Sequence, residues 1–90
     1  MTVNTKSGFT CEVDEDALND WEIVEKLVAA QGRDYSAMIS VIKDLLGAEG
    51  YDAVKDFVRT DKGRVPIDKV SELFFEILSA AGEQNLAKKK

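Results

Sequence analysis

The sequence predicts a mainly α-helical protein, a small bundle of about four helices with a short N-terminal β-hairpin. Apolar residues recur at the spacing of one helical face over residues 64–81, and weaker versions of this pattern precede it. The first thirteen residues instead alternate apolar and polar side chains around Lys6-Ser7-Gly8, which is typical of two short strands. We therefore expect one helical domain over residues 1–82.

The hairpin prediction depends on Gly8, which supplies the positive φ that a tight turn between strands requires. Phe9, Cys11 and Val13 would share one face of the second strand. A lone hairpin is marginally stable in water. We therefore expect it to lie against the helices or to extend a sheet in another subunit.

Two helices are expected next. The first begins at a capping box with Asn19 as N-cap and Glu22 at the third helical position. Its inward stripe is expected to comprise Trp21, Val24, Leu27 and Val28. The second helix begins at Asp34, a favourable N-cap residue, and Gly47 closes it.

A third helix is expected from about residue 49 to about residue 59, and the last helix follows Pro66, whose fixed φ suits a first turn. Gly82 is expected to end this last helix. Residues 83–90 are polar, end in three lysines, and are expected to form a disordered tail. The residues expected in the core are Trp21, Val28, Ile42, Leu45, Val54, Leu73, Phe74 and Ile77.

The composition argues against several classes of function. A net charge of −5 disfavours a nucleic-acid partner, because phosphate binding needs clustered lysine and arginine. The chain has no histidine, the commonest general base and metal ligand. The single cysteine, Cys11, has no histidine to activate it and cannot form an internal disulfide. With no signal peptide and no apolar stretch long enough to span a bilayer, we expect a cytoplasmic protein that does not bind membranes.

The acidic run over residues 12–22 raises a calcium hypothesis, which its spacing does not support. A calcium loop that starts at Asp14 would place Leu18 at the fifth position and Asn19 at the sixth, where an oxygen ligand and glycine are needed. The turn over residues 61–65 fails at other positions: with Gly63 sixth, Val58 would be first and Lys69 twelfth, and neither can bind calcium. We predict no metal, no cofactor and no catalytic residues, although a pair of carboxylates that meet in space stays open as an enzyme hypothesis.

Large apolar residues outside the helical stripes are the one feature that exceeds an ordinary core. Phe75 lies beside the main stripe of the last helix, Ile67 lies at its start, and Val41 is off the stripe of the second helix. A chain of ninety residues can bury only part of such surface by itself. We therefore predict that Val41, Ile67 and Phe75 bind a partner or mediate self-association, with a fuller core as the alternative.

The order of these features resembles the short tail assembly chaperones of long-tailed phages and prophages of Gram-positive bacteria. The resemblance extends from Thr5 to about Ala81, with the connection over residues 32–37 departing from the expected pattern. The segments that carry it are residues 5–9 (TKSGF), 16–22 (DALNDWE), 45–47 (LLG) with Tyr51, and 61–66 (DKGRVP).

The resemblance implies a non-enzymatic protein that keeps the phage tape measure protein soluble, helps tail tube subunits polymerise around it, and is absent from the finished virion. Binding of a long apolar helical client would use the surplus apolar surface of a small acidic carrier. A regulatory or adaptor module of a prophage or other mobile element remains the alternative, since it would use the same kind of helical surface.

Overall fold

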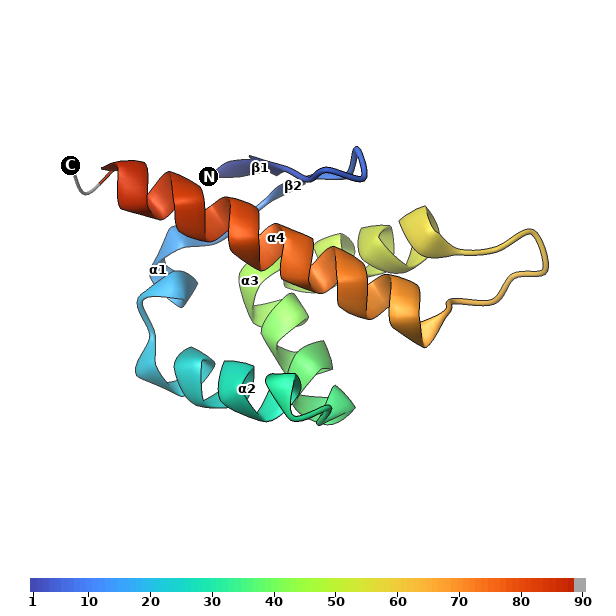
Figure 1. Cartoon of the computed structure of the whole chain (residues 1–90), viewed down its shortest axis with the longest axis horizontal. Coiled ribbons are helices and arrows are strands. Elements are labelled where there is room, and N and C mark those ends of the chain that lie inside the picture. Colours follow the sequence, from blue (N-terminus) through green and yellow to red (C-terminus); the bar gives the residue numbers. More distant parts are fainter. Residues whose placement is uncertain (89–90) are drawn as a thin grey trace.

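The computed structural model describes the backbone of residues 1–88 and the side chains of residues 1–82. Within these residues the chain forms a two-stranded antiparallel hairpin followed by four helices (Figure 1). This confirms the predicted fold class. The elements in order are β1 (Thr2–Asn4), β2 (Thr10–Glu12), α1 (Glu15–Leu18), α2 (Trp21–Gln31), α3 (Tyr35–Val58) and α4 (Ile67–Lys88).

The hairpin lies along α4 and the second half of α3 (Figure 1). Its strands pair with Val3 opposite Cys11, and the Thr5 N–H donates to the Phe9 carbonyl at 2.9 Å to close the turn. Val3, Phe9 and Val13 are buried against the helices. This satisfies the expectation that a hairpin too small to be stable alone would pack on the helical part.

The start of α2 differs from the prediction by one residue. Asp20, not Asn19, is the N-cap, and its carboxylate accepts from the Glu22 N–H at 2.8 Å. Asn19 instead caps the C-terminus of the short helix α1. The Asp34 cap is as predicted, because its side chain accepts from the Ala37 N–H at 3.1 Å.

Helix α2 is rotated relative to the prediction, so that only Leu27 of the predicted inward stripe packs against the core. Trp21 and Val28 are 75% and 66% exposed, so their predicted place in the core is wrong. Val24, also predicted to face inward, is 39% exposed. Leu27 faces inward as predicted, and Ile23 and Ala30 complete a second apolar stripe on the same helix. Since both stripes have helical spacing, periodicity alone could not tell which of them the rest of the fold would cover.

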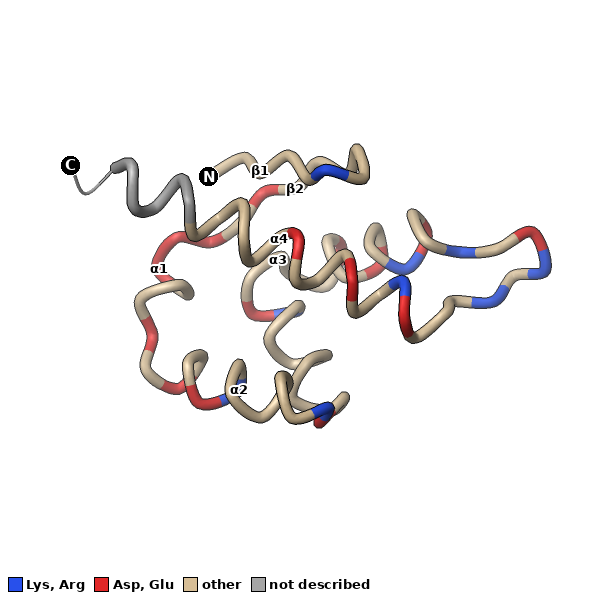
Figure 2. Tube along the Cα trace, in the orientation of Figure 1, with Lys and Arg blue, Asp and Glu red and all other residues tan. Residues whose placement is uncertain are grey.

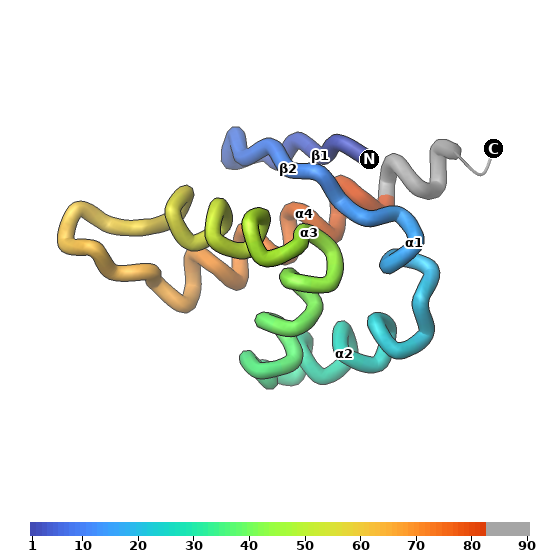
Figure 3. The backbone as a smooth tube through the Cα atoms, turned by 180° about the vertical axis from the view of Figure 1, so that it is seen from behind, coloured from blue at the N-terminus to red at the C-terminus, as the bar shows by residue number. Residues whose placement is uncertain are grey.

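Helix α3 consists of two helical segments joined at Gly47, where φ is 76° and ψ is 171°. The chain changes direction there (Figure 3), so Gly47 separates the second and third predicted helices. In an uninterrupted helix the Leu45 carbonyl would accept from the N–H four residues later. Here it accepts from the Asp14 N–H at 2.9 Å, which fixes the segment after the hairpin to the kink.

Helix α4 runs along the length of the molecule and contributes the centre of the core (Figure 1). Leu73, Phe74 and Ile77 are buried against Ile42, Leu45 and Val54 of α3, as predicted. The helix has bounds Ile67–Lys88, so the expected end at Gly82 is wrong. The disordered tail expected over residues 83–90 lies outside the residues whose side chains are described.

Candidate functional site

The outward side of α4 carries two parallel rows of side chains, each with the four-residue spacing of neighbouring turns. The first row is apolar or small and comprises Ile67, Ser71, Phe75 and Ser79; the second is acidic and comprises Asp68, Glu72 and Glu76. Ile67 and Phe75 remain 63% and 41% exposed, and are the large apolar side chains of the first row. The solvent-exposed side of α4 is therefore an apolar strip with carboxylates along one edge.

A groove of about 740 Å³ lies between the first half of α4 and the turn from α2 to α3. We refer to it as the turn groove. It is lined by Ala30, Gln31, Arg33, Tyr35, Met38, Pro66, Ile67, Asp68, Ser71, Glu72 and Phe75. A smaller hollow of about 240 Å³ adjoins it, shares Tyr35, Met38, Ile67 and Ser71, and adds Ile39. Together the two hollows form an apolar floor with charged residues at the rim.

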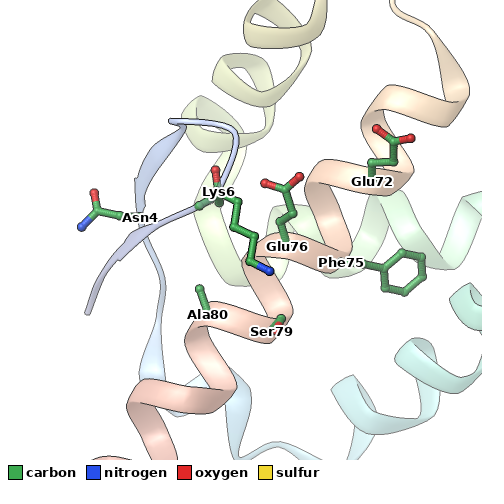
Figure 4. A pocket seen from close by; sticks show the side chains of 8 residues that line it. Asn4, Lys6, Glu72, Phe75, Glu76, Ser79 and Ala80 are labelled. Atoms are coloured by element: carbon green, nitrogen blue, oxygen red, sulfur yellow. The ribbon is translucent and has the colours of Figure 1, made fainter.

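A second groove, of about 550 Å³, lies on the other side of Phe75, between α4 and the hairpin (Figure 4). Its lining includes Lys6 from the hairpin and Glu72, Glu76 and Ser79 from α4. Figure 4 shows the ring of Phe75 pointing away from Lys6 and Glu76. Phe75 thus forms the ridge between the two grooves, with its ring on the side of the turn groove.

The tip of the hairpin is hydrogen-bonded to α4 at this ridge. Ser7 donates to the Glu76 carboxylate from its N–H at 3.1 Å and from its Oγ at 2.7 and 2.8 Å. These hydrogen bonds lower the pKa of Glu76 below its ordinary value, because they stabilise the ionised form. The hairpin is therefore tied to the helix that carries the candidate surface.

Two of the three residues predicted to bind a partner lie together in the turn groove. Ile67 and Phe75 both line it, two turns apart on α4. Val41 is different, because it is fully buried in the core between α3 and its neighbours. The prediction that Val41 lies on the partner-binding surface is therefore wrong. Helix α3 packs against both α2 and α4, so a residue off its main stripe is still covered. The partner-binding role of the other two stays a prediction.

Tyr35 and Ile39 belong to the site although neither was predicted there. Both are partly exposed, at 43% and 40%, and both face the hollow beside Ile67. Their four-residue spacing at the start of α3 was visible in the sequence. Their exposure could not be predicted, because nothing in the sequence shows that α4 leaves the first turn of α3 uncovered.

The outer face of α2 is a separate exposed apolar surface. Trp21, Val24 and Val28 lie along it at helical spacing, and Figure 1 places α2 at the edge of the molecule. None of them lines the turn groove. The described residues thus include an exposed apolar surface on α4, which is concave, and a separate one on α2, which is convex.

The acidic run gathers around α1 and the start of α2 (Figure 2). Cations lie beside these carboxylates: the N-terminal ammonium of Met1 is 3.8 Å from Glu12 and 3.9 Å from Glu15, and the Lys26 Nζ donates to Asp44 at 2.8 Å. Among the residues described, no group of three or more potential ligands is placed to hold a metal ion. In the same part of the chain, no helix has both the length and the apolar character that crossing a bilayer requires.

Cys11 lies on the hairpin and is only partly exposed. Burial raises the pKa of its thiol, and the neighbouring Glu12 carboxylate raises it further. Both effects favour the protonated thiol, which is the less reactive form.

Comparison of the chain with protein-family models, curated proteins and solved structures finds no significant match to any of them.

Proposed function

We propose that this protein is a non-catalytic tail assembly chaperone that binds the tape measure protein of a long-tailed phage through the turn groove. The observation that carries the proposal is the exposure of Ile67 and Phe75 in one apolar groove on α4. A groove between helices with apolar anchors two turns apart suits a client helix, whose own apolar residues recur at the same spacing.

The physical demands of the role fit this chain. A tape measure protein is a long apolar helical client, and such a client aggregates unless its apolar face is covered. A small carrier with a net charge of −5 would add charge to the complex and keep it in solution. In this proposal the protein acts in the host cytoplasm, helps tail tube subunits assemble around the client, and leaves before the virion is complete.

The second exposed surface favours one alternative. A regulatory or adaptor module of a mobile element has to contact two partners, and the α2 stripe of Trp21, Val24 and Val28 is separate from the turn groove. Under this alternative both surfaces are needed for activity. Under the chaperone proposal the turn groove holds the client, and the α2 stripe is dispensable for that contact.

Under this proposal the same phage or prophage encodes a tape measure protein, and co-expression of the two genes tests it. We expect the tape measure protein to become soluble and to co-purify with this chain. Phe75→Gln should abolish co-purification, because it removes the central apolar anchor without changing charge. Val28→Gln is the matched control: it removes a more exposed apolar side chain from α2 and should leave co-purification intact.

Circular dichroism of both variants confirms that the helices are retained. Loss of capture in Val28→Gln but not in Phe75→Gln would move the binding surface to α2 and favour the adaptor. No capture by the wild-type chain would refute the chaperone proposal. Gel filtration of the protein alone measures whether the same surface also supports self-association.

A further inference from the structure

The turn groove has opposite charges on its two walls. Arg33 stands on the wall formed by the turn between α2 and α3, and Asp68 and Glu72 stand on the wall formed by α4. The apolar floor, with Ile67 and Phe75, lies along the α4 side between these rims. A ligand that fills the groove therefore meets a cation along one edge and carboxylates along the other.

Arg33 occupies a backbone conformation that its side chain disfavours. Its φ is 69°, in the left-handed region, and the other positive φ values within the described residues belong to glycines. Gly32 precedes it with an ordinary φ of −83°, so the glycine is one position too early to relieve the strain. The side chain of Arg33 also forms no hydrogen bond or ion pair in the described part of the chain. A strained arginine with an unused guanidinium at a groove rim suggests a role toward a ligand.

The carboxylates on the facing wall are also available. Asp68 forms no ion pair within the described residues, and Glu72 contacts Lys69 at 3.7 Å with both side chains more than half exposed. An exposed pair of this kind is weak and exchanges readily for another partner. Lys69 is the one cation of α4 beside this rim, and it does not line the groove.

We propose that the turn groove takes an amphipathic helix from another protein, with acidic residues along the edge that faces Arg33 and basic residues along the edge that faces Asp68 and Glu72. This rests on the proposed function and specifies its client helix. The distance from Ile67 to Phe75 is about 12 Å along α4, enough for roughly two turns of the bound helix. The charge pattern also fixes the direction in which that helix lies.

A second copy of this chain is a poor occupant. Its exposed stripe on α2 is flanked by Glu22 and Glu25, and its exposed stripe on α4 is flanked by Asp68, Glu72 and Glu76, so the charged residues beside both stripes are acidic. They could pair with Arg33 but would repel the α4 wall.

Three synthetic peptides of about 18 residues, long enough to form a helix when bound, test the proposal. All share one leucine face. The split peptide has lysine along one flank and glutamate along the other, the basic peptide has lysine along both, and the acidic peptide has glutamate along both. Fluorescence anisotropy of labelled peptide gives each dissociation constant at low and high salt. We expect the split peptide to bind the wild-type chain about tenfold tighter than the basic one, because lysine in place of glutamate along one edge loses the pairing with Arg33 and adds a repulsion.

Two substitutions of Arg33 make the test specific. Arg33→Glu should reverse the preference, so that the basic peptide binds tightest, whereas Lys62→Glu on the distant α3–α4 loop should leave the order unchanged. Arg33→Gly should raise the melting temperature by relieving the strained φ, yet weaken the split peptide about tenfold. A residue with a purely structural role would not separate stability from binding in this way.

The proposal is overturned if the basic or acidic peptide binds wild type as tightly as the split one, or if Arg33→Glu leaves the order unchanged. Its failure is distinct from failure of the proposed function. Co-purification of the tape measure protein with no peptide preference would retain the chaperone and discard the charge pattern. The expected peptide preference with no co-purification would retain the groove and discard the client.

Discussion

Phe74 and Phe75 are adjacent in sequence and differ sharply in environment, which makes their alanine variants an internal comparison. Phe74 is 1% exposed in the core, and Phe75 is 41% exposed at the ridge between the two grooves. Both substitutions make the same chemical change in the middle of the same helix. The change in helix propensity therefore cancels between them, and the difference in stability measures burial alone.

The structure gives the expected magnitudes. Removing a fully buried phenylalanine costs about 3 to 5 kcal/mol, since the lost burial is joined by an unfilled cavity. Only a little more than half of Phe75 is buried, and water can fill the space that its removal leaves. Phe75→Ala should therefore lower the free energy of unfolding by about 1 to 2 kcal/mol. The two variants should then differ by about 2 kcal/mol, or roughly 8 to 16 °C in melting temperature for a domain of this size.

Urea denaturation followed by far-ultraviolet circular dichroism measures both free energies of unfolding, with thermal melts as a second reading. Equal losses for the two variants would contradict the assignment. Phe75 would then belong to a closed core, the turn groove would not exist in solution, and the proposed client site would lose its central anchor. A small loss for Phe74→Ala would instead contradict the packing of α4 on α3.

Three further outcomes follow from particular residues. Gly47→Ala should lower the free energy of unfolding by about 1 to 3 kcal/mol in urea denaturation, because the φ of 76° with ψ of 171° at this position is a conformation that only glycine adopts easily. Gly82→Ala is the control and should not destabilise the protein, since a Cβ at Gly82 would meet open space. The pKa of Glu76 is lowered on folding, so its contribution to stability is present above its ordinary value of 4.5 and is lost as pH falls through the lower folded value. Ser7→Ala should flatten this part of the stability–pH curve, and an unchanged curve would show that the hairpin tip is not held there. Trp21, the only tryptophan, should emit like an indole in water and be quenched freely by iodide, whereas a protected, blue-shifted emission would mean that the α2 stripe is covered in solution.

The parts of the fold that sequence reasoning predicted correctly are those with a single local solution. An aspartate directly before a segment with helical apolar spacing is favoured as an N-cap, and Asp34 caps α3 as expected. The stripe of α4 has one dominant apolar face, which is the buried one. Where two solutions compete, the sequence does not decide: α2 has two apolar stripes, and only the position of α3 determines that Ile23, not Trp21, is covered.

The candidate site was predictable only in part, for a related reason. Phe75 and Ile67 stand apart from the core stripe of their own helix, so the sequence marks them as surplus. The opposite wall is formed by the turn between α2 and α3. Its residues can be assigned to the site only when the position of that turn beside α4 is known. Arg33 in particular shows no pattern in the sequence, because neither its left-handed backbone nor the carboxylates across the groove can be read locally.

The bond between Ser7 and Glu76 joins residues 69 positions apart, and this determines the order in which the molecule can be completed during synthesis. Helices α2 and α3 are neighbours in sequence and can pair as soon as both have left the ribosome, since short loops close at low entropic cost. The hairpin is made first, and Phe9 can pack on Phe57 of α3, but β1 with Val3 lies against α4 and is covered only when α4 arrives. Until then the nascent chain exposes an apolar strand pair with unpaired edges, and such chains aggregate readily. A pause in translation before α4 should therefore reduce the yield of soluble protein more than the same pause after it.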